Sequence, residues 1–135
     1  MAARSRGFTL VELAVAAAAA ATLAAIALPS LQDRLVRARR ADASAALQRV
    51  QLAQERHHAL HGLYAADLAA LGQSGASPEG LYRVTLQPGP GEGYLATAQA
   101  RADGAQAGDR DCAAITLRVV QGFAQLGPSA RCWNR

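Results

Sequence analysis

Hydrophobic residues are distributed unevenly along this chain of 135 residues. The stretch from Phe8 to Leu28 is apolar except for a single charge, Glu12, and it follows a short leader that carries Arg4 and Arg6. As an α-helix this stretch would be roughly 31 Å long, which matches a hydrocarbon core of roughly 30 Å. We expect residues 8–28 to form a membrane-spanning helix. Because nearly half of this stretch is Ala, it should be only weakly hydrophobic.

A second helical pattern continues directly from the first. Pro29 removes a helical hydrogen bond and bends a helix, but apolar residues then return every three or four positions until Gly62. We expect one long helix, kinked at Pro29, whose part over residues 29–61 continues into a head. One face should pack on that head through Ala43, Ala46, Leu47, Val50, Ala53, Gln54, His57 and Leu60. The opposite, solvent-facing side should carry Arg39, Arg40, Arg49, Glu55 and Arg56.

Residues 62–135 are expected to form a globular head. After a connection rich in small residues, hydrophobic and polar positions alternate with a period of two, as in half-buried strands. The predicted strands are 82–87, 94–100, 115–119 and 123–126, with a turn at Gln121-Gly122 before the last. Short connections favour an antiparallel sheet with one face covered by the helix. The pattern therefore predicts an α+β fold, with a long N-terminal helix packed on a small antiparallel sheet.

Composition narrows the range of functions. Ala is the commonest residue and aromatic residues account for only 4%, so the core must be small and a large cofactor pocket is not expected. There is no Ser, His and Asp arrangement at a known spacing and no phosphate-binding Gly loop. We therefore expect neither an enzyme nor a bound cofactor. All 14 basic residues are Arg and the net charge is +4, which permits an acidic partner.

The N-terminal segment fits three interpretations. A secretory signal would end at Ala25-Ile26-Ala27, although its apolar region would be unusually long and would contain Glu12. A plain membrane anchor would tolerate Glu12, but a carboxylate inside a membrane segment is costly and usually marks function. In the third interpretation, the run Gly7-Phe8-Thr9-Leu10-Val11-Glu12-Leu13 behind a basic leader resembles the class III signal of type IV pilins and pseudopilins.

This resemblance implies a processing site and an assembly role. Prepilin peptidase would cut between Gly7 and Phe8, remove residues 1–7 and methylate the new amino group of Phe8. Glu12 would then neutralise the Phe8 amine of a neighbouring subunit in the filament, since a lone carboxylate that leaves water costs several kcal/mol unless it is paired. Pro29 occupies the place of a family Pro in the assembling helix. No Gly lies between Phe8 and Pro29, so this helix should melt less readily on assembly.

The resemblance also implies partners and a location. The partners would be other pilin subunits, the prepilin peptidase and an inner-membrane assembly platform, with membrane lipid around residues 8–28 before assembly. The head would be periplasmic while the subunit is stored in the inner membrane and extracellular once it joins a pilus fibre. Pilus biogenesis, adhesion, twitching motility and DNA uptake are the functions open to such a subunit.

Two cysteines, Cys112 and Cys132, lie near the C-terminus. They could form one disulfide if the head leaves the cytoplasm, and closing a loop of this length stabilises a fold by roughly 3 kcal/mol. A redox pair is disfavoured because the C-x-x-C spacing is missing. The run from Asp109 to Cys112, then Ile115-Thr116-Leu117, Gly122 and Cys132-Trp133, resembles the C-terminal signature of minor pilins of the PilE kind, whose disulfide loop is variable and exposed.

Two metal sites can be considered, and neither is favoured. His57, His58 and His61 lie near one another on the predicted helix, but zinc prefers three or four ligands and no Cys or carboxylate ligand is close in sequence. Some pseudopilins bind calcium near the C-terminus, which draws attention to Asp103, Asp109 and Asp111. Their spacing matches no dedicated calcium loop, so a solvated acidic turn beside Arg110 is the preferred interpretation.

Three functions therefore remain open. The favoured one is a structural subunit of a type IV pilus, in the class of minor pilins. The second is a DNA-binding receptor pilin, whose phosphate contacts would be Arg83, Arg101, Arg110, Arg118, Arg131 and Arg135. The third is a pseudopilin of type II secretion, which shares the N-terminal motif but fits the loop from Cys112 to Cys132 less well.

Overall fold

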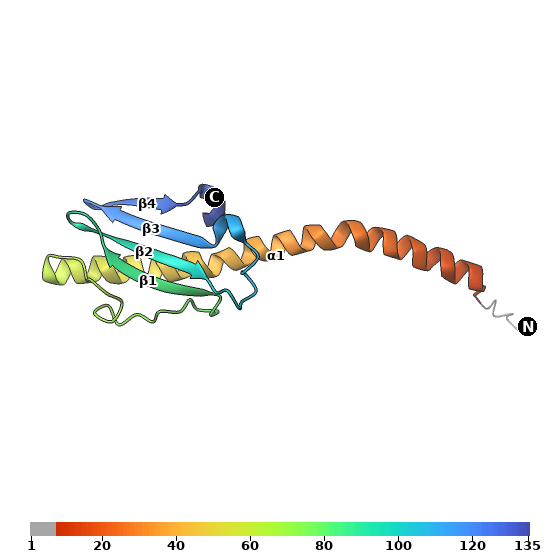
Figure 1. The fold of residues 1–135 in the computed structure, drawn as a ribbon, viewed down its shortest axis with the longest axis horizontal. Helices are drawn as coiled ribbons and strands as arrows, with labels where there is room; N and C mark the ends of the chain where they lie inside the picture. Colours follow the sequence, from red (N-terminus) through yellow and green to blue (C-terminus); the bar gives the residue numbers. More distant parts are fainter. Residues whose placement is uncertain (1–7) are drawn as a thin grey trace, which may run out of the picture. The chain divides into compact units, whose positions relative to one another are not determined.

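The computed structural model describes residues 8–135. The leader and Gly7, and with them one side of the expected cleavage site, lie outside the described residues. One long helix, α1 (Leu10–His61), occupies the N-terminal part of the described chain (Figure 1). The chain divides into two compact units after Leu35. The helix passes through Pro29 without interruption, so the predicted continuity of the two helical patterns is confirmed.

Helix α1 begins two residues after Phe8 with a capping box. Thr9 accepts a hydrogen bond at Oγ1 from the backbone N–H of Glu12, at 3.2 Å, and Glu12 Oε2 accepts one from the backbone N–H of Thr9, at 2.9 Å. These reciprocal bonds satisfy two of the N–H groups that a helix start leaves without partners. The first part of α1 is long and apolar enough to cross a membrane, and its large apolar side chains are exposed.

The head contains a four-stranded sheet in the order β1-β2-β3-β4, with every neighbouring pair antiparallel. The strands are β1 (Tyr82–Pro88), β2 (Gly93–Ala100), β3 (Ala114–Val120) and β4 (Phe123–Gly127). Gln121 and Gly122 have φ of 49° and 81°, the left-handed pair that a tight hairpin between β3 and β4 requires. The α+β prediction, its four strands and this turn are confirmed.

The core lies between the sheet and the part of α1 that runs alongside it (Figure 1). Ala43, Leu47 and Val50 of the helix pack in one cluster with strand residues that include Tyr82 and Tyr94. Small side chains on β2 are fully buried there, which lets the sheet approach the helix closely. The predicted stripe is wrong at its end, because Leu60 is 80% exposed. The buried helix residues end at Gln54, so Leu60 lies beyond the packed part of the helix.

Two polar helix residues fix the connection between α1 and β1. The Gln54 side chain is fully buried and bonds both the N–H and the C=O of Ala65, at 2.8 and 2.9 Å. The buried Asp42 carboxylate accepts bonds from Ser77 and from the backbone N–H groups of Glu79 and Leu81. The connection has little regular structure of its own, and these bonds give its buried backbone groups the partners they need.

The prediction that Arg40 faces solvent is wrong. Arg40 is 3% exposed, and its Nε and Nη2 donate to the two carboxylate oxygens of Asp109 at 2.7 and 2.8 Å. Its Nη1 also donates to the backbone oxygen of Arg131. The interpretation of Asp109 as part of a solvated acidic turn fails for the same reason, because a bidentate partner allows both charges to be buried.

The predicted disulfide between Cys112 and Cys132 is present. It joins the short helical turn η1 (Arg110–Cys112), which precedes β3, to η2 (Ala130–Trp133), which follows β4. The indole N–H of Trp133 donates to the backbone oxygen of Gly127 at 3.0 Å. The disulfide therefore holds the C-terminal loop to η1, and the Trp133 hydrogen bond holds it to the end of β4.

Candidate nucleic-acid interface

The face of the sheet that turns away from α1 carries mostly polar side chains, with the apolar Leu95, Val120 and Phe123 among them. Arg83 of β1 lies opposite Gln99 of β2, and Arg118 of β3 lies opposite Gln125 of β4. All four are exposed. A row of threonines, Thr85, Thr97 and Thr116, runs across the strands between these two pairs. Asp and Glu are absent from all four described strands, so this outer face is basic and rich in hydrogen-bonding groups.

An open hollow of about 460 Å³ lies at one edge of this face. Arg83, Gln99 and Arg101 line it together with Asp103. Arg101 donates two hydrogen bonds to Asp103, at 3.1 and 3.2 Å, and both side chains are largely exposed. The bond from Arg101 lowers the pKa of Asp103, and the charge of Arg83 lowers it further. The carboxylate therefore stays ionised and partly offsets the two guanidinium charges at this edge.

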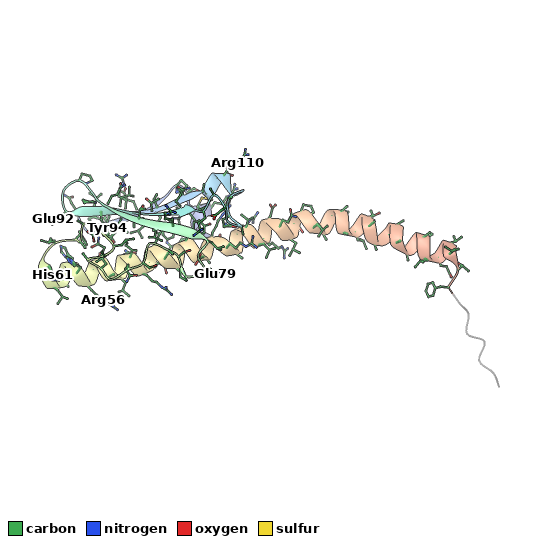
Figure 2. The ribbon with its side chains drawn as sticks, turned by 60° about the horizontal axis from the view of Figure 1, so that its bottom comes forward. Arg56, His61, Glu79, Glu92, Tyr94 and Arg110 are labelled. Carbon is green, nitrogen blue, oxygen red and sulfur yellow. A yellow bond between two sulfur atoms is a disulfide. The ribbon has the colours of Figure 1, made fainter. Side chains whose placement is uncertain are left out.

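The six arginines predicted as phosphate contacts divide into separate groups. Arg83 and Arg101 share the hollow at the sheet edge, and Arg118 lies on the outer face two strands away. Arg131 and Arg135 line a different hollow with Arg37 and Asn134. Arg110 is exposed at η1, at the end of the sheet opposite the turn that carries Glu92 (Figure 2).

Sequence reasoning missed the amides that accompany the arginines. Gln99 and Gln125 lie directly opposite Arg83 and Arg118 in the sheet register, which the sequence alone does not give. The alternation within each strand does assign both to the polar face, and that signal could have found them. Arg37 lines the hollow of Arg131 and Arg135 but lies within the long helix α1. No pattern in the sequence indicates that it lies near the C-terminal residues.

The histidines predicted as a weak metal candidate contact one another and a tyrosine. His57 and His61 stack with ring centroids 4.2 Å apart, and His58 stacks on Tyr64 at 4.5 Å. A ring nitrogen of His57 lies 2.9 Å from the backbone oxygen of Leu63. Within residues 8–135, His, Cys, Asp and Glu form no group of three that could hold a metal ion.

Each carboxylate considered for calcium has an arginine partner. Asp109 pairs with Arg40 in the interior, and on the surface Asp103 pairs with Arg101. Asp111 accepts a bond from Arg131 at 3.1 Å, also on the surface. The three side chains therefore neutralise three separate cations instead of converging on one site.

A long N-terminal helix, a four-stranded antiparallel head and a C-terminal disulfide loop define the class of the type IV pilins, which are structural and not catalytic. Residues 29–116 match the family model described as "Type IV minor pilin ComP, DNA uptake sequence receptor". Residues 2–28 match the model of the prokaryotic N-terminal methylation motif. The chain belongs to the type IV minor pilin ComP family. No curated protein matches the chain.

The family assignment confirms the minor-pilin interpretation of the sequence, and the second match confirms an N-terminal methylation motif within residues 2–28. It places the chain among subunits of type IV pili, whose partners include other pilins and a prepilin peptidase. The N-terminal helix is apolar enough to cross a membrane, as a pilin stored there before assembly requires.

Proposed function

We propose that this minor pilin is a receptor for double-stranded DNA and that the outer face of the sheet is its contact surface. The family description names a receptor for a DNA uptake sequence. The observation that carries the proposal for this chain is the pairing of Arg83 with Gln99 and of Arg118 with Gln125 on a face whose four described strands hold no acidic residue.

The chemistry of these side chains suits DNA. Arg contacts phosphates or the O6 and N7 atoms of guanine, while Gln bonds N6 and N7 of adenine in the major groove. In the sheet register Arg83 and Arg118 are two strands and four residues apart, which is roughly 16 Å. A major groove is ~12 Å wide, so the two guanidinium groups could reach the backbones on either side of it. The threonines between the two arginines are small enough to let the DNA approach the sheet closely.

The test is duplex binding by the full chain in detergent micelles, followed by fluorescence anisotropy over a range of salt concentrations. Each lost phosphate contact should lower the slope of log affinity against log salt by about 0.9. Arg83→Gln with Arg118→Gln should therefore lower the slope by about 2 and weaken binding to every duplex. Arg49→Gln with Arg56→Gln is the matched control, because both residues are exposed on α1. Equal slopes for the two double variants would refute the proposed surface.

The amides have a separate test. Gln99→Ala and Gln125→Ala remove a base-reading group without changing charge, so they should reduce discrimination between duplex sequences and leave the salt slope unchanged. Competition between a preferred duplex, selected with the unmodified chain, and a scrambled duplex measures this discrimination. A preference that survives both substitutions would assign base recognition to another surface.

We also propose that the chain is cut between Gly7 and Phe8, methylated on Phe8 and assembled through residues 8–28, with Glu12 pairing the Phe8 amine of a neighbour. Support comes from the match of residues 2–28 to the methylation motif and from the single carboxylate within residues 8–28. Mass spectrometry of the membrane-extracted protein should find an N-terminus at a methylated Phe8. An intact Met1 would contradict this processing.

A further inference from the structure

A second basic surface lies at the C-terminal end of the head, away from the sheet's outer face. Arg37 of α1 and Arg131, Asn134 and Arg135 line an open hollow of about 480 Å³ with no acidic side chain among the four. The side-chain amide of Asn134 donates to the backbone oxygen of Arg37 at 3.0 Å, which fixes this end of the chain against the helix. We call these four residues the basic end.

The basic end is close in the chain to the membrane-spanning segment. Arg37 follows Leu28 by nine positions of α1, and nine helical residues measure about 14 Å along the helix. The headgroup region of one leaflet occupies roughly 5–7 Å of that distance. Leu31 and Leu35 are exposed apolar residues one turn apart, which suit the boundary between lipid and water. So short a stretch of chain leaves Arg37 within reach of the surface charge of a membrane that holds residues 8–28, whose field decays over about one Debye length, ~8 Å.

We propose that the basic end binds the headgroup phosphates of anionic phospholipids while the subunit is stored in the membrane. Guanidinium groups are weakly hydrated and match phosphate oxygens in a planar fork, so three of them around one hollow suit a phosphodiester headgroup. Each Arg near an anionic surface contributes about a fivefold preference, and three together on the order of 100-fold. The ion pair of Arg131 with Asp111 is largely exposed and therefore weak, so Arg131 can leave Asp111 and bind a headgroup phosphate at little cost.

The charge on DNA is also a phosphodiester, but the position of the basic end favours lipid. A membrane-stored subunit holds Arg37 beside the bilayer surface, whereas a duplex at the same place would have to lie against an anionic surface of its own sign. The outer face of the sheet, by contrast, has no residue near the membrane segment in the chain. The two basic surfaces thus bind two different anionic ligands.

Binding of this kind gives the stored subunit an orientation. The apolar segment is rich in Ala and anchors weakly, so contacts made by the head add to retention in an anionic leaflet. These contacts depend on ionic strength and must break when the subunit is extracted into a fibre. The basic end therefore acts as a reversible second attachment point beside the helix.

The single Trp of the chain, Trp133, reports on this attachment because it lies within η2 beside the basic end. The full chain is reconstituted into nanodiscs of phosphatidylcholine, alone or with one third phosphatidylglycerol, that contain a lipid with a dansyl headgroup. Energy transfer from Trp133 to dansyl should be stronger in the anionic discs and fall to the neutral-disc value at high salt. Arg37→Gln with Arg131→Gln and Arg135→Gln should lower the ratio of docked to free head by on the order of 100-fold.

The matched control is Arg83→Gln with Arg101→Gln and Arg118→Gln, which removes the same charge from the sheet side and should keep the lipid dependence. Near-ultraviolet circular dichroism and an intact disulfide establish that both triple variants are folded. Equal energy transfer in neutral and anionic discs would overturn the proposal, as would equal losses in the two triple variants. Loss of duplex binding by the basic-end variant, with its lipid dependence retained, would assign the basic end to DNA instead.

Discussion

The buried ion pair of Arg40 and Asp109 joins residues that are 69 positions apart, and it holds the loop before β3 on the helix. The hydrogen bond to Asp109 raises the pKa of Arg40, so the guanidinium remains charged in the interior. Gln106 lies fully buried beside the pair and donates to the hydroxyl of Tyr82 at 2.9 Å. A charged and polar network therefore occupies the part of the interior next to the apolar core.

Removal of one partner of this pair should be costly. Asp109→Asn or Arg40→Gln leaves the other charge buried without a counterion, which typically destabilises a fold by about 3–5 kcal/mol. The combined change Arg40→Met with Asp109→Leu removes both charges and should cost much less. Denaturant unfolding of the full chain in micelles, followed by near-ultraviolet circular dichroism, measures the free energy of unfolding. Equal losses for the single and double variants would show that the pair acts through packing and not through charge.

Removal of the Tyr94 hydroxyl should stabilise the head. Tyr94 is fully buried, and its hydroxyl oxygen has no hydrogen-bond partner within residues 8–135. A buried hydroxyl without a partner costs about 1–3 kcal/mol, so Tyr94→Phe should raise the free energy of unfolding by about 1 kcal/mol. The edge contact with the ring of Tyr64, at 5.0 Å, is retained. Tyr82→Phe is the control, since its hydroxyl accepts the bond from Gln106, and it should destabilise the head.

At the scale of the elements, the sequence predicts most of the fold because each element has a regular period. Helix α1 follows from spacings of three and four, and the strands follow from alternation, which also assigns Arg83, Gln99 and Arg118 to one face. The sequence does not reveal which residues lie opposite one another, because strand register depends on how turns close. The sequence also predicts the wrong environment for Arg40. A charged residue on a helix is normally exposed, and its partner Asp109 belongs to a distant loop.

The helix start shows a further signal that was present and missed. Thr9 and Glu12 fit the Thr-x-x-Glu pattern of a capping box, and the structure places both reciprocal bonds. Glu12 therefore has a partner inside its own chain. In an assembled filament, the proposed pairing with a neighbouring Phe8 amine would have to compete with the N–H of Thr9 for the same oxygens.

This double role predicts that capping and assembly can be separated. Glu12→Gln keeps the cap, because Gln serves as well as Glu at this position, but it removes the negative charge. We expect the chain to insert in the membrane and fold normally while its amount in sheared pili falls at least tenfold. Immunoblots of membrane and pilus fractions measure both amounts. The control Thr9→Ser keeps the cap and the charge, so it should assemble normally. A Glu12→Gln chain that is as abundant in pili as the unmodified chain would exclude the charge-pairing role.

The disulfide is the second element whose contribution can be isolated. It joins η1 to η2 across 20 positions of sequence, and closing such a loop stabilises the fold by roughly 3 kcal/mol in the chain-entropy model. Cys112→Ser with Cys132→Ser should lower the free energy of unfolding by about that amount. The basic end should also lose its fixed position, because η2 carries Arg131 and precedes Asn134. Faster amide hydrogen exchange in residues 128–135, with β1 and β2 unchanged, would show the local part of this effect.

On the scale of the whole molecule, the chain has an unusual set of titrating groups at high pH. It contains no Lys, its 14 basic residues are all Arg, and both cysteines are in the disulfide. Because Arg remains protonated throughout, the three tyrosines are the side chains of the head that ionise above pH 9. All three are at least partly buried, and two of them, Tyr94 and Tyr64, connect the core to the helix end near His58.

Burial is the main cause that raises the pKa of Tyr64, Tyr82 and Tyr94 above the ordinary value near 10. Below that pH both folded and unfolded chains keep their phenolic protons, so the stability gained by burying neutral tyrosines is fully present. At higher pH the unfolded chain loses protons first, and the free energy of unfolding must fall as pH rises through the folded pKa values.

Unfolding midpoints measured in steps from pH 8 to pH 12 should therefore stay level to about pH 10 and then decline. Tyr94→Phe removes one of the shifted groups and should make this decline shallower, whereas Arg49→Gln should leave it unchanged. A midpoint that stayed constant up to pH 12 would contradict this prediction. It would mean that the folded head accommodates tyrosinate, although the buried Tyr94 hydroxyl has no hydrogen-bond partner within residues 8–135.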